Sequence, residues 1–149
     1  MPNSKTLGRP VEILLIDDSP SDALLTKEAL KHGTTPNNFH HVKDGPSAMA
    51  YLQRRGEFAA ATRPDLVLLD LDMPGMDGRD VLRAIRSDDA LKNLTVVVLT
   101  TSSAREDIAS AYELLANCYI TKPVDMKEFA QAMRAFDEFW LTWAALPSA

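Results

Sequence analysis

Hydrophobic residues gather in five short runs along the chain, separated by segments with helical spacing. The runs are rich in β-branched or bulky apolar residues and are too short for buried helices, so they predict strands. They read VEILLI from Val11, FHHVK from Phe39, LVLLD from Leu66, TVVVLT from Thr95 and CYIT from Cys118. Strands that alternate with helices predict right-handed crossovers, and therefore an α/β fold with a parallel sheet.

The segments between the runs carry helix start and stop signals. The first has a good N-cap, a proline with helical φ, an acid at the positive helix end and a glycine stop, namely Ser19, Pro20, Asp22 and Gly33. These signals predict a helix over 20–32. Similar patterns predict helices over 46–55, 78–86 and 104–115, and a last helix that begins after Asp125.

The last helix carries an aromatic stripe that continues past residue 140. Its members recur at spacings of four and three, so we expect them on one face: Phe129, Met133, Phe136, Trp140 and Trp143. We expect the first three to pack on the sheet. Trp140, Trp143 and Leu146 need another surface, and we predict a homodimer through the face that holds the last strand and its two neighbouring helices. The alternative is a tail that folds back over its own subunit.

Composition and charge narrow the class of protein. The 149 residues leave room for one ordinary domain, which we place at 11–140 between a flexible lead-in over 1–10 and a C-terminal extension over 141–149. A content of 46% hydrophobic and 25% charged residues argues against disorder and membrane insertion. The net charge of −5 argues against nucleic-acid binding. The single Cys118 and the lack of a secretion signal favour a reducing cytoplasm.

Polar residues follow four of the five predicted strands at their carboxyl ends. Asp17 and Asp18 follow the first strand, Asp70 the third, Thr100 ends the fourth, and Lys122 follows the fifth. Ligands of open parallel sheets bind outside these ends, at the point where the strand order reverses. We therefore expect the five side chains to converge on one site.

The chemistry of this set points to a cation and a phosphoryl group. Carboxylates about 4 Å apart repel by roughly 4 kcal/mol per pair at an effective dielectric of ~20, so a positive charge must lie among them. The ligands are all hard oxygens, which favours Mg²⁺, with Mn²⁺ as the alternative, over zinc. A carboxylate beside such a cation and a lysine can attack a phosphoryl group, which predicts an aspartyl phosphate at Asp70.

Residues 11–140 resemble the receiver domains of two-component response regulators. The matching pieces are Asp17-Asp18, the D-x-x-M-P-x-M-D-G stretch over 70–78, Thr100, Tyr119 and Lys122-Pro123. The resemblance implies a doubly wound, flavodoxin-like (CheY-like) fold with five strands in the order 2-1-3-4-5. It also implies phosphorylation by the phosphohistidine of a sensor kinase, a signalling role without enzymatic turnover of a substrate, and a cis Lys122–Pro123 peptide.

The resemblance assigns a role to each matched site residue. Asp70 matches the phosphoacceptor and Lys122 the lysine that pairs with the phosphate. Asp18 matches the direct metal ligand, Asp17 a ligand that acts largely through water, and Asp72 the position whose backbone carbonyl completes the coordination.

Two further positions match the switch of these proteins. The Thr100 hydroxyl is implied to turn toward the phosphoryl oxygens, and the Tyr119 ring to move inward behind it. Two departures stand nearby: Cys118 replaces a frequent glycine, and Thr101 replaces a smaller residue, which we expect to alter access to the phosphate and its lifetime.

Four segments are most similar to the single-domain response regulators of bacterial and cyanobacterial phytochromes. They are IDDSPSDALLTKEAL from Ile16, VVVLTTS from Val96, YELLANCYITKP from Tyr112 and FDEFWLTW from Phe136. This similarity implies a light-sensing histidine kinase as partner, with a downstream relay or effector protein.

Other interpretations of the same residues remain open at this point. LVLLDLD also resembles the nucleophile motif of haloacid-dehalogenase-type phosphatases, with Asp70 as nucleophile and Asp72 as acid and base, although Met73-Pro74 fits that motif poorly. A flavin module is disfavoured because DDSPSD is acidic where a phosphate loop would lie. Asp17-Asp18 could only cap a helix, and Tyr119 could only pack. The histidines at 32, 40 and 41 are expected at the surface or at helix ends.

Overall fold

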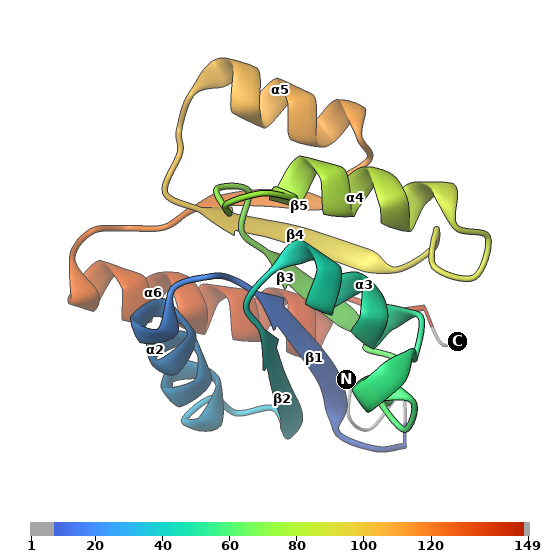
Figure 1. Ribbon diagram of the computed structural model, residues 1–149. Helices are drawn as coiled ribbons and strands as arrows, with labels where there is room; N and C mark the ends of the chain where they lie inside the picture. The colour runs from blue at the N-terminus through green and yellow to red at the C-terminus, as the bar shows by residue number, and fades with distance from the viewer. Residues whose placement is uncertain (1–7, 148–149) are drawn as a thin grey trace.

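Five parallel strands form the centre of the chain, which the computed structural model describes over residues 8–147 (Figure 1). The strands are β1 (Val11–Ile16), β2 (Asn37–Val42), β3 (Leu66–Leu69), β4 (Thr95–Thr100) and β5 (Cys118–Thr121). Their order is β2-β1-β3-β4-β5, and every neighbouring pair is parallel. The predicted α/β class and the implied strand order are confirmed. Strand β2 begins two residues before the predicted run and ends one residue before its end, and β3 also ends one residue early.

The helices lie within a few residues of their predicted positions. They are α2 (Pro20–Lys31), α3 (Gly45–Leu52), α4 (Gly78–Ser87), α5 (Arg105–Glu113) and α6 (Met126–Phe136), with a short 3₁₀ turn η1 (Gly56–Phe58) and a π-helix η2 (Asp137–Trp143). Over residues 8–147, no helix has both the length and the apolar character needed to span a membrane. The predictions for residues 1–7 and 148–149 lie outside the described part of the chain.

Two apolar cores fill the space between the sheet and its helices. The helices α2 and α6 cover one face, and α3, α4 and α5 cover the other (Figure 1). Strands β1, β3 and β4 are buried along their whole length, which explains their nearly unbroken hydrophobic runs. Strand β5, at the edge of the sheet, is only partly buried.

The aromatic stripe of the last helix does not stay on one face, contrary to the prediction. Phe129, Met133 and Phe136 are buried, but the chain then continues as the π-helix η2. A π-helix bonds residue i to residue i+5, so it rotates the following side chains away from the α-helical stripe. Trp140 is therefore only partly buried against the core, and 68% of Trp143 is exposed.

The tail after η2 folds back onto its own subunit. Ala144 has an extended backbone, and Leu146 is buried in the same core as Leu141. The prediction that Leu146 needs a partner surface is therefore wrong, because its own subunit covers it.

A buried carboxylate in η2 anchors the tail to the loop between α2 and β2. Asp137 Oδ2 accepts hydrogen bonds from the backbone N–H and the hydroxyl of Thr34, at 3.1 and 3.2 Å. The contact is tight, since a Cβ at Gly33 would lie 2.9 Å from Asp137 Cγ. The glycine expected as a helix stop thus also leaves room for this carboxylate.

Candidate functional site

The carboxyl ends of β1, β3 and β5 bring acidic and basic side chains together. Lys122 Nζ lies 2.6 Å from Asp17 Oδ2 and 3.6 Å from Asp70 Oδ2. One carboxylate oxygen from each of Asp17, Asp18 and Asp70 lies within 4.8 Å of the other two. Residues more than 100 positions apart in sequence thus meet at one end of the sheet.

The group is buried except for one member. Asp17, Asp70 and Lys122 are 1%, 6% and 5% exposed, whereas Asp18 is exposed to solvent. Burial of a charge is costly unless the charge is paired, and a single ammonium here faces several carboxylates. The site is therefore an electronegative basin that reaches solvent beside Asp18.

The pKa values follow from this burial and crowding. Desolvation raises the pKa of Asp70, and the nearby charge of Asp17 raises it further, while Lys122 opposes both effects. For Lys122 itself, burial alone lowers the pKa, but the hydrogen bond and charge of Asp17, with the charge of Asp70, raise it above its ordinary value. Lys122 is thus held as a cation, and Asp70 carries a charge that the fold opposes.

Local backbone structure fixes each acid in place. The Ser19 N–H donates to Asp17 Oδ1 at 2.9 Å, and the Asp72 N–H donates to Asp70 Oδ1 at 3.2 Å. The glycine that begins α4 matters for the same reason, because a Cβ at Gly78 would lie 2.2 Å from the carbonyl oxygen of Asp70. The loop from Asp70 to α4 therefore closes this tightly only with glycine at that position.

The donor set fits a hard divalent cation. The three acids supply only carboxylate oxygens, and the exposed position of Asp18 leaves space for water ligands. The two buried acids already share the ammonium of Lys122, so the basin keeps a negative surplus that a cation would neutralise. The Asp72 side chain is exposed, and its carboxylate accepts a hydrogen bond from Thr100 at 3.4 Å. The metal role of its backbone carbonyl stays a prediction.

The two predicted switch residues lie on the neighbouring strands β4 and β5. Thr100 is fully buried at the end of β4, and its hydroxyl is close enough to Asp70 to favour the charged form of that carboxyl group. The Tyr119 hydroxyl donates to the carbonyl of Ser102 at 2.8 Å. Tyr119 thus holds the segment that follows Thr100 and the exposed Thr101.

Two residues at the site escaped the sequence analysis. Asp22 Oδ2 lies 3.0 Å from Lys122 Nζ, although Asp22 was interpreted only as a favourable charge at a helix start. Sequence spacing gave no signal for this contact, because the direction of the Asp22 side chain on α2 decides it. His41 Nε2 lies 2.7 Å from the carbonyl oxygen of Asp17, so this ring nitrogen carries the proton and donates. No pattern in the sequence marks that contact.

A second polar cluster, also missed by the sequence analysis, lies behind the switch segment. Asp107 of α5 accepts hydrogen bonds from the Ser102 hydroxyl and from Arg79 of α4. Because Ser102 also receives the Tyr119 hydroxyl, these contacts join α4, α5 and β5 around the segment that follows β4.

The Lys122–Pro123 peptide is trans, as are the other peptide bonds of residues 8–147, which differs from the implied cis form. With the trans bond, the Lys122 N–H donates to the Thr100 carbonyl at 2.6 Å and the side chain still reaches Asp17.

Comparisons with known proteins agree with this geometry. Residues 13–134 match the family model of the response regulator receiver domain. Response regulator Rcp1 of Synechocystis sp. is 43% identical over 140 residues, which cover 94% of this chain and 95% of that protein. A chemotaxis protein of Vibrio cholerae, CheY-3, is 36% identical over 78% of this chain and 84% of its own length.

Solved structures give the same result. The phosphorylated cyanobacterial phytochrome response regulator RcpA is 47% identical and matches with a TM-score of 0.89, over 93% of this chain and 99% of its own. The Mn²⁺-bound form of Rcp1 is 42% identical and also has a TM-score of 0.89, over 93% and 100% of the two chains. The alternative of a haloacid-dehalogenase-type phosphatase is not supported. The chain belongs to the response regulator receiver family, whose members are phosphoacceptors in two-component signalling and bind a divalent metal ion.

Proposed function

We propose that Asp70 accepts a phosphoryl group from the phosphohistidine of a sensor kinase in a Mg²⁺-dependent reaction. The observation that carries this proposal is the position of its carboxylate, buried at the end of β3 with Lys122 at 3.6 Å and two further acids around it. The pKa of Asp70 is raised by burial, which makes its ionised oxygen a better nucleophile than an exposed carboxylate would be.

The transfer exchanges one bond for another. An Asp70 oxygen attacks phosphorus, the phosphorus–nitrogen bond breaks, and the electron pair stays with the imidazole of the kinase. Lys122 is placed to stabilise the charge on the phosphoryl oxygens, and Thr100 to donate a hydrogen bond to them. Asp17, Asp18 and Asp70 would hold Mg²⁺, which neutralises charge on the attacking group and the phosphoryl group when bound.

The output of this reaction is a change in a protein-binding face. If Thr100 turns toward a phosphoryl group on Asp70, its hydrogen bond to Asp72 is exchanged and the segment through Ser102 must adjust. Tyr119 is bonded to the Ser102 carbonyl, so the adjustment reaches β5 and the surface beside it. We propose that a downstream relay or effector protein, or the kinase itself, reads this surface.

Phosphotransfer to Asp70→Asn tests the assignment of the acceptor. With a phosphorylated sensor kinase and Mg²⁺, we expect stable label on the wild-type protein and on Asp89→Asn, because the Asp89 side chain is 99% exposed and pairs with Lys92. We expect none on Asp70→Asn, and loss of wild-type labelling when a chelator is added. Label on Asp70→Asn at the wild-type rate would exclude Asp70 as the acceptor.

We propose a phytochrome histidine kinase as the cognate partner. Support comes from the similarity to RcpA, described as a phytochrome response regulator, over almost the whole of both chains. The test compares transfer rates from a bacterial phytochrome kinase and from a chemotaxis kinase. Equal rates would argue against this partner and would leave the assignment of Asp70 untouched. The unpaired Cys118 agrees with a cytoplasmic location for this exchange.

We further propose a homodimer that uses the face of α5, β5 and α6 with the exposed side of η2. Trp143 and Phe139 are 68% and 57% exposed, and Phe139 stacks edge-on against Trp140 at 5.3 Å. Exposed aromatic groups of this size on adjacent turns are typical of interfaces. Light scattering should give a dimer mass for the wild type and for Leu24→Ala, a control at an exposed position of α2 outside this face, and a monomer mass for Trp143→Ala. An unchanged mass of Trp143→Ala would contradict this interface.

A further inference from the structure

A buried glutamate at the amino end of the sheet has a carboxylate oxygen without a partner. Glu12 of β1 is 7% exposed, and its Oε2 atom makes no hydrogen bond. The neighbouring His40 of β2 has the same defect, because its Nε2 atom is buried and also makes no hydrogen bond. Of the side chains described over 8–147, only these two and Asp137 bury such an atom, and Asp137 satisfies its other oxygen through Thr34. An unsatisfied buried polar group lowers the stability of the fold, so two such groups side by side indicate that a ligand can satisfy them.

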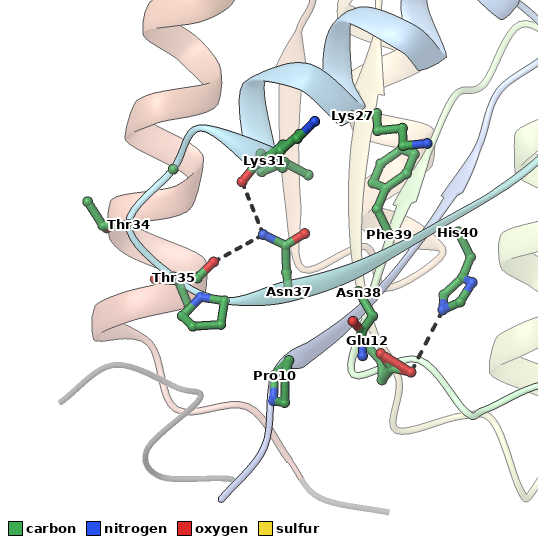
Figure 2. A pocket seen from close by; sticks show the side chains of 13 residues that line it. Pro10, Glu12, Lys27, Lys31, Thr34, Thr35, Asn37, Asn38, Phe39 and His40 are labelled. Atoms are coloured by element: carbon green, nitrogen blue, oxygen red, sulfur yellow. Dashed lines mark hydrogen bonds and ion pairs between the residues drawn. The ribbon is translucent and has the colours of Figure 1, made fainter.

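The two unsatisfied atoms belong to side chains that face each other. In the register of β1 and β2, Glu12 is opposite Asn38, and Leu14 is opposite His40. Side chains two positions apart on a strand share a face, so Glu12, Asn38 and His40 all lie on the face covered by α3. Figure 2 shows His40 directed at the Glu12 carboxylate with Asn38 beside it, and Nε2 is 3.7 Å from Oε1. This distance is too long for a hydrogen bond.

The pair lies at an open pocket of about 620 Å³ at the edge of the sheet (Figure 2). The two lysines that line this pocket, Lys27 and Lys31, come from α2 and lie on the opposite side of β2, near Phe39 and Asn37. Arg9 senses the charge of Glu12, but it is already neutralised by Asp65, which accepts hydrogen bonds from both of its terminal nitrogens. Within residues 8–147, the Glu12 carboxylate therefore forms no ion pair with a lysine or an arginine, and its only neighbour of this kind is His40.

We propose that Glu12 and His40 form a binding site for one divalent transition-metal ion of the zinc type, completed by water from the pocket. Ligands of one tetrahedral zinc ion lie roughly 3.4 Å apart for metal–ligand distances near 2.1 Å, so the observed pair needs to close by only a few tenths of an ångström. A mixed set of imidazole nitrogen and carboxylate oxygen is typical of zinc sites and disfavours Mg²⁺. The carboxylate charge also reaches Tyr51 of α3, whose pKa is raised first by burial and then by Glu12.

This site would be independent of the acidic basin around Asp70. Glu12 precedes Asp17 by five residues along β1, which corresponds to about 16 Å at the usual rise of a strand. The two sites also differ in donor type, with only oxygens at the carboxyl end and a histidine at the amino end. Zinc binding at Glu12 and His40 should therefore persist when Mg²⁺ fills the basin and when Asp70 is replaced.

Calorimetric titration with ZnCl₂ in excess Mg²⁺ tests the proposal on the full chain. We expect saturable binding of one zinc ion to the wild type and to Asp70→Asn, and affinity at least about tenfold weaker in His40→Gln and Glu12→Gln. His40 is 41% exposed at its side chain, so its variant tests the site even if Glu12→Gln fails to fold. The visible spectrum of Co²⁺ bound in place of zinc gives a second readout of a nitrogen ligand.

A matched histidine–glutamate pair on the surface provides the control. His32 Nε2 lies 3.6 Å from Glu28 Oε2 on α2, at nearly the same separation, but both side chains are largely exposed. His32→Gln should keep the zinc affinity of the wild type. The proposal fails if zinc does not bind saturably, if His40→Gln binds as the wild type does, or if His32→Gln removes the binding.

Discussion

The two ends of the sheet bury aspartates in opposite ways. At the amino end, Asp65 precedes β3 and is 5% exposed, and it accepts both terminal nitrogens of Arg9, at 2.6 and 2.8 Å, and the Glu12 N–H at 2.8 Å. At the carboxyl end, Asp17 and Asp70 share a single cation, Lys122, with a further carboxylate at 3.0 Å from its ammonium.

The difference separates a structural carboxylate from a reactive one. The charge of Asp65 is matched by the guanidinium of Arg9, and its oxygens accept three hydrogen bonds, two of them from that group, so nothing is left for a ligand. The basin around Asp70 holds more carboxylate charge than its lysine can neutralise, and the surplus favours a metal ion and a phosphoryl group. Charge balance around a buried acid thus distinguishes the two roles better than burial does.

The largest expected effect comes from removing the one cation of the basin. Lys122→Met should slow phosphotransfer to Asp70 at least about 100-fold, equivalent to roughly 2.7 kcal/mol, because the phosphoryl oxygens lose their ammonium. Initial rates with a phosphorylated kinase and saturating Mg²⁺ measure the effect. Lys92→Met serves as the control, since Lys92 is half-exposed and pairs with the exposed Asp89, away from the basin. A Lys122→Met rate within twofold of the wild type would show that the ammonium does not act in transfer.

A smaller effect, on stability alone, is expected at the amino end. Asp65→Asn should lower the free energy of unfolding by about 1–2 kcal/mol, because it weakens a buried set of hydrogen bonds while water still solvates the half-exposed Arg9. Arg9→Gln should cost more, since it leaves the buried carboxylate without its cation. Urea denaturation measures both, and phosphotransfer should stay at the wild-type rate. A greater loss of unfolding free energy in Asp65→Asn than in Arg9→Gln would contradict the view that Arg9 balances the buried charge of Asp65.

Much of the fold was predictable because its signals are local. The buried strands β1, β3 and β4 show as apolar runs, and caps such as Ser19 and Asp125 hold the helix starts that were predicted from them. The prediction of one continuous aromatic stripe is wrong from residue 137 onward. The change from α-helix to π-helix there depends on tertiary contacts such as the Asp137–Thr34 hydrogen bonds. Local spacing carries no information about those contacts.

The acids of the site were predictable for a different reason. Asp17, Asp70 and Lys122 each follow a strand, and parallel topology carries strand ends to one place. The contacts of Asp22, His41 and Asp107 were not predictable, since they depend on side-chain direction and on the spacing between helices. The sequence thus indicates which residues come to the carboxyl end of the sheet, whereas packing determines which of their atoms form hydrogen bonds and ion pairs.

Replacing the reactive acid should stabilise the protein slightly. In metal-free buffer near pH 7, Asp70→Asn should raise Tm by about 2–4 °C, the shift that roughly 1 kcal/mol gives in a chain of this size. The pKa of Asp70 is raised by burial and by Asp17, so its ionisation costs more in the native than in the unfolded state. The gain should therefore be absent below the ordinary pKa of 3.8 and should grow as pH rises through the native value.

Added Mg²⁺ sharpens this test of the basin. Mg²⁺ that binds the native state should raise the Tm of the wild type more than that of Asp70→Asn, because the variant lacks one ligand. An equal shift in both proteins, or a lower Tm for the variant without metal, would show that the charge of Asp70 is already balanced.

The smallest effect is expected at Asp107. Its charge is paired, as that of Asp65 is, but it lies in the network beside the switch residues. Its carboxylate is matched by Ser102 and Arg79, as Asp65 is by Arg9, but a quarter of its side chain is exposed. The hydrogen bond from Ser102, with the charge of Arg79, lowers the pKa of Asp107, so its contribution to stability is present above 3.8 and lost as pH falls through the native value. Asp107→Asn should lower Tm by less than about 2 °C at pH 7, and the difference from the wild type should disappear in acid. A difference that persists unchanged at a pH below the native pKa of Asp107, which lies under 3.8, would mean that the charge of Asp107 contributes nothing, and that packing alone holds α4 against α5.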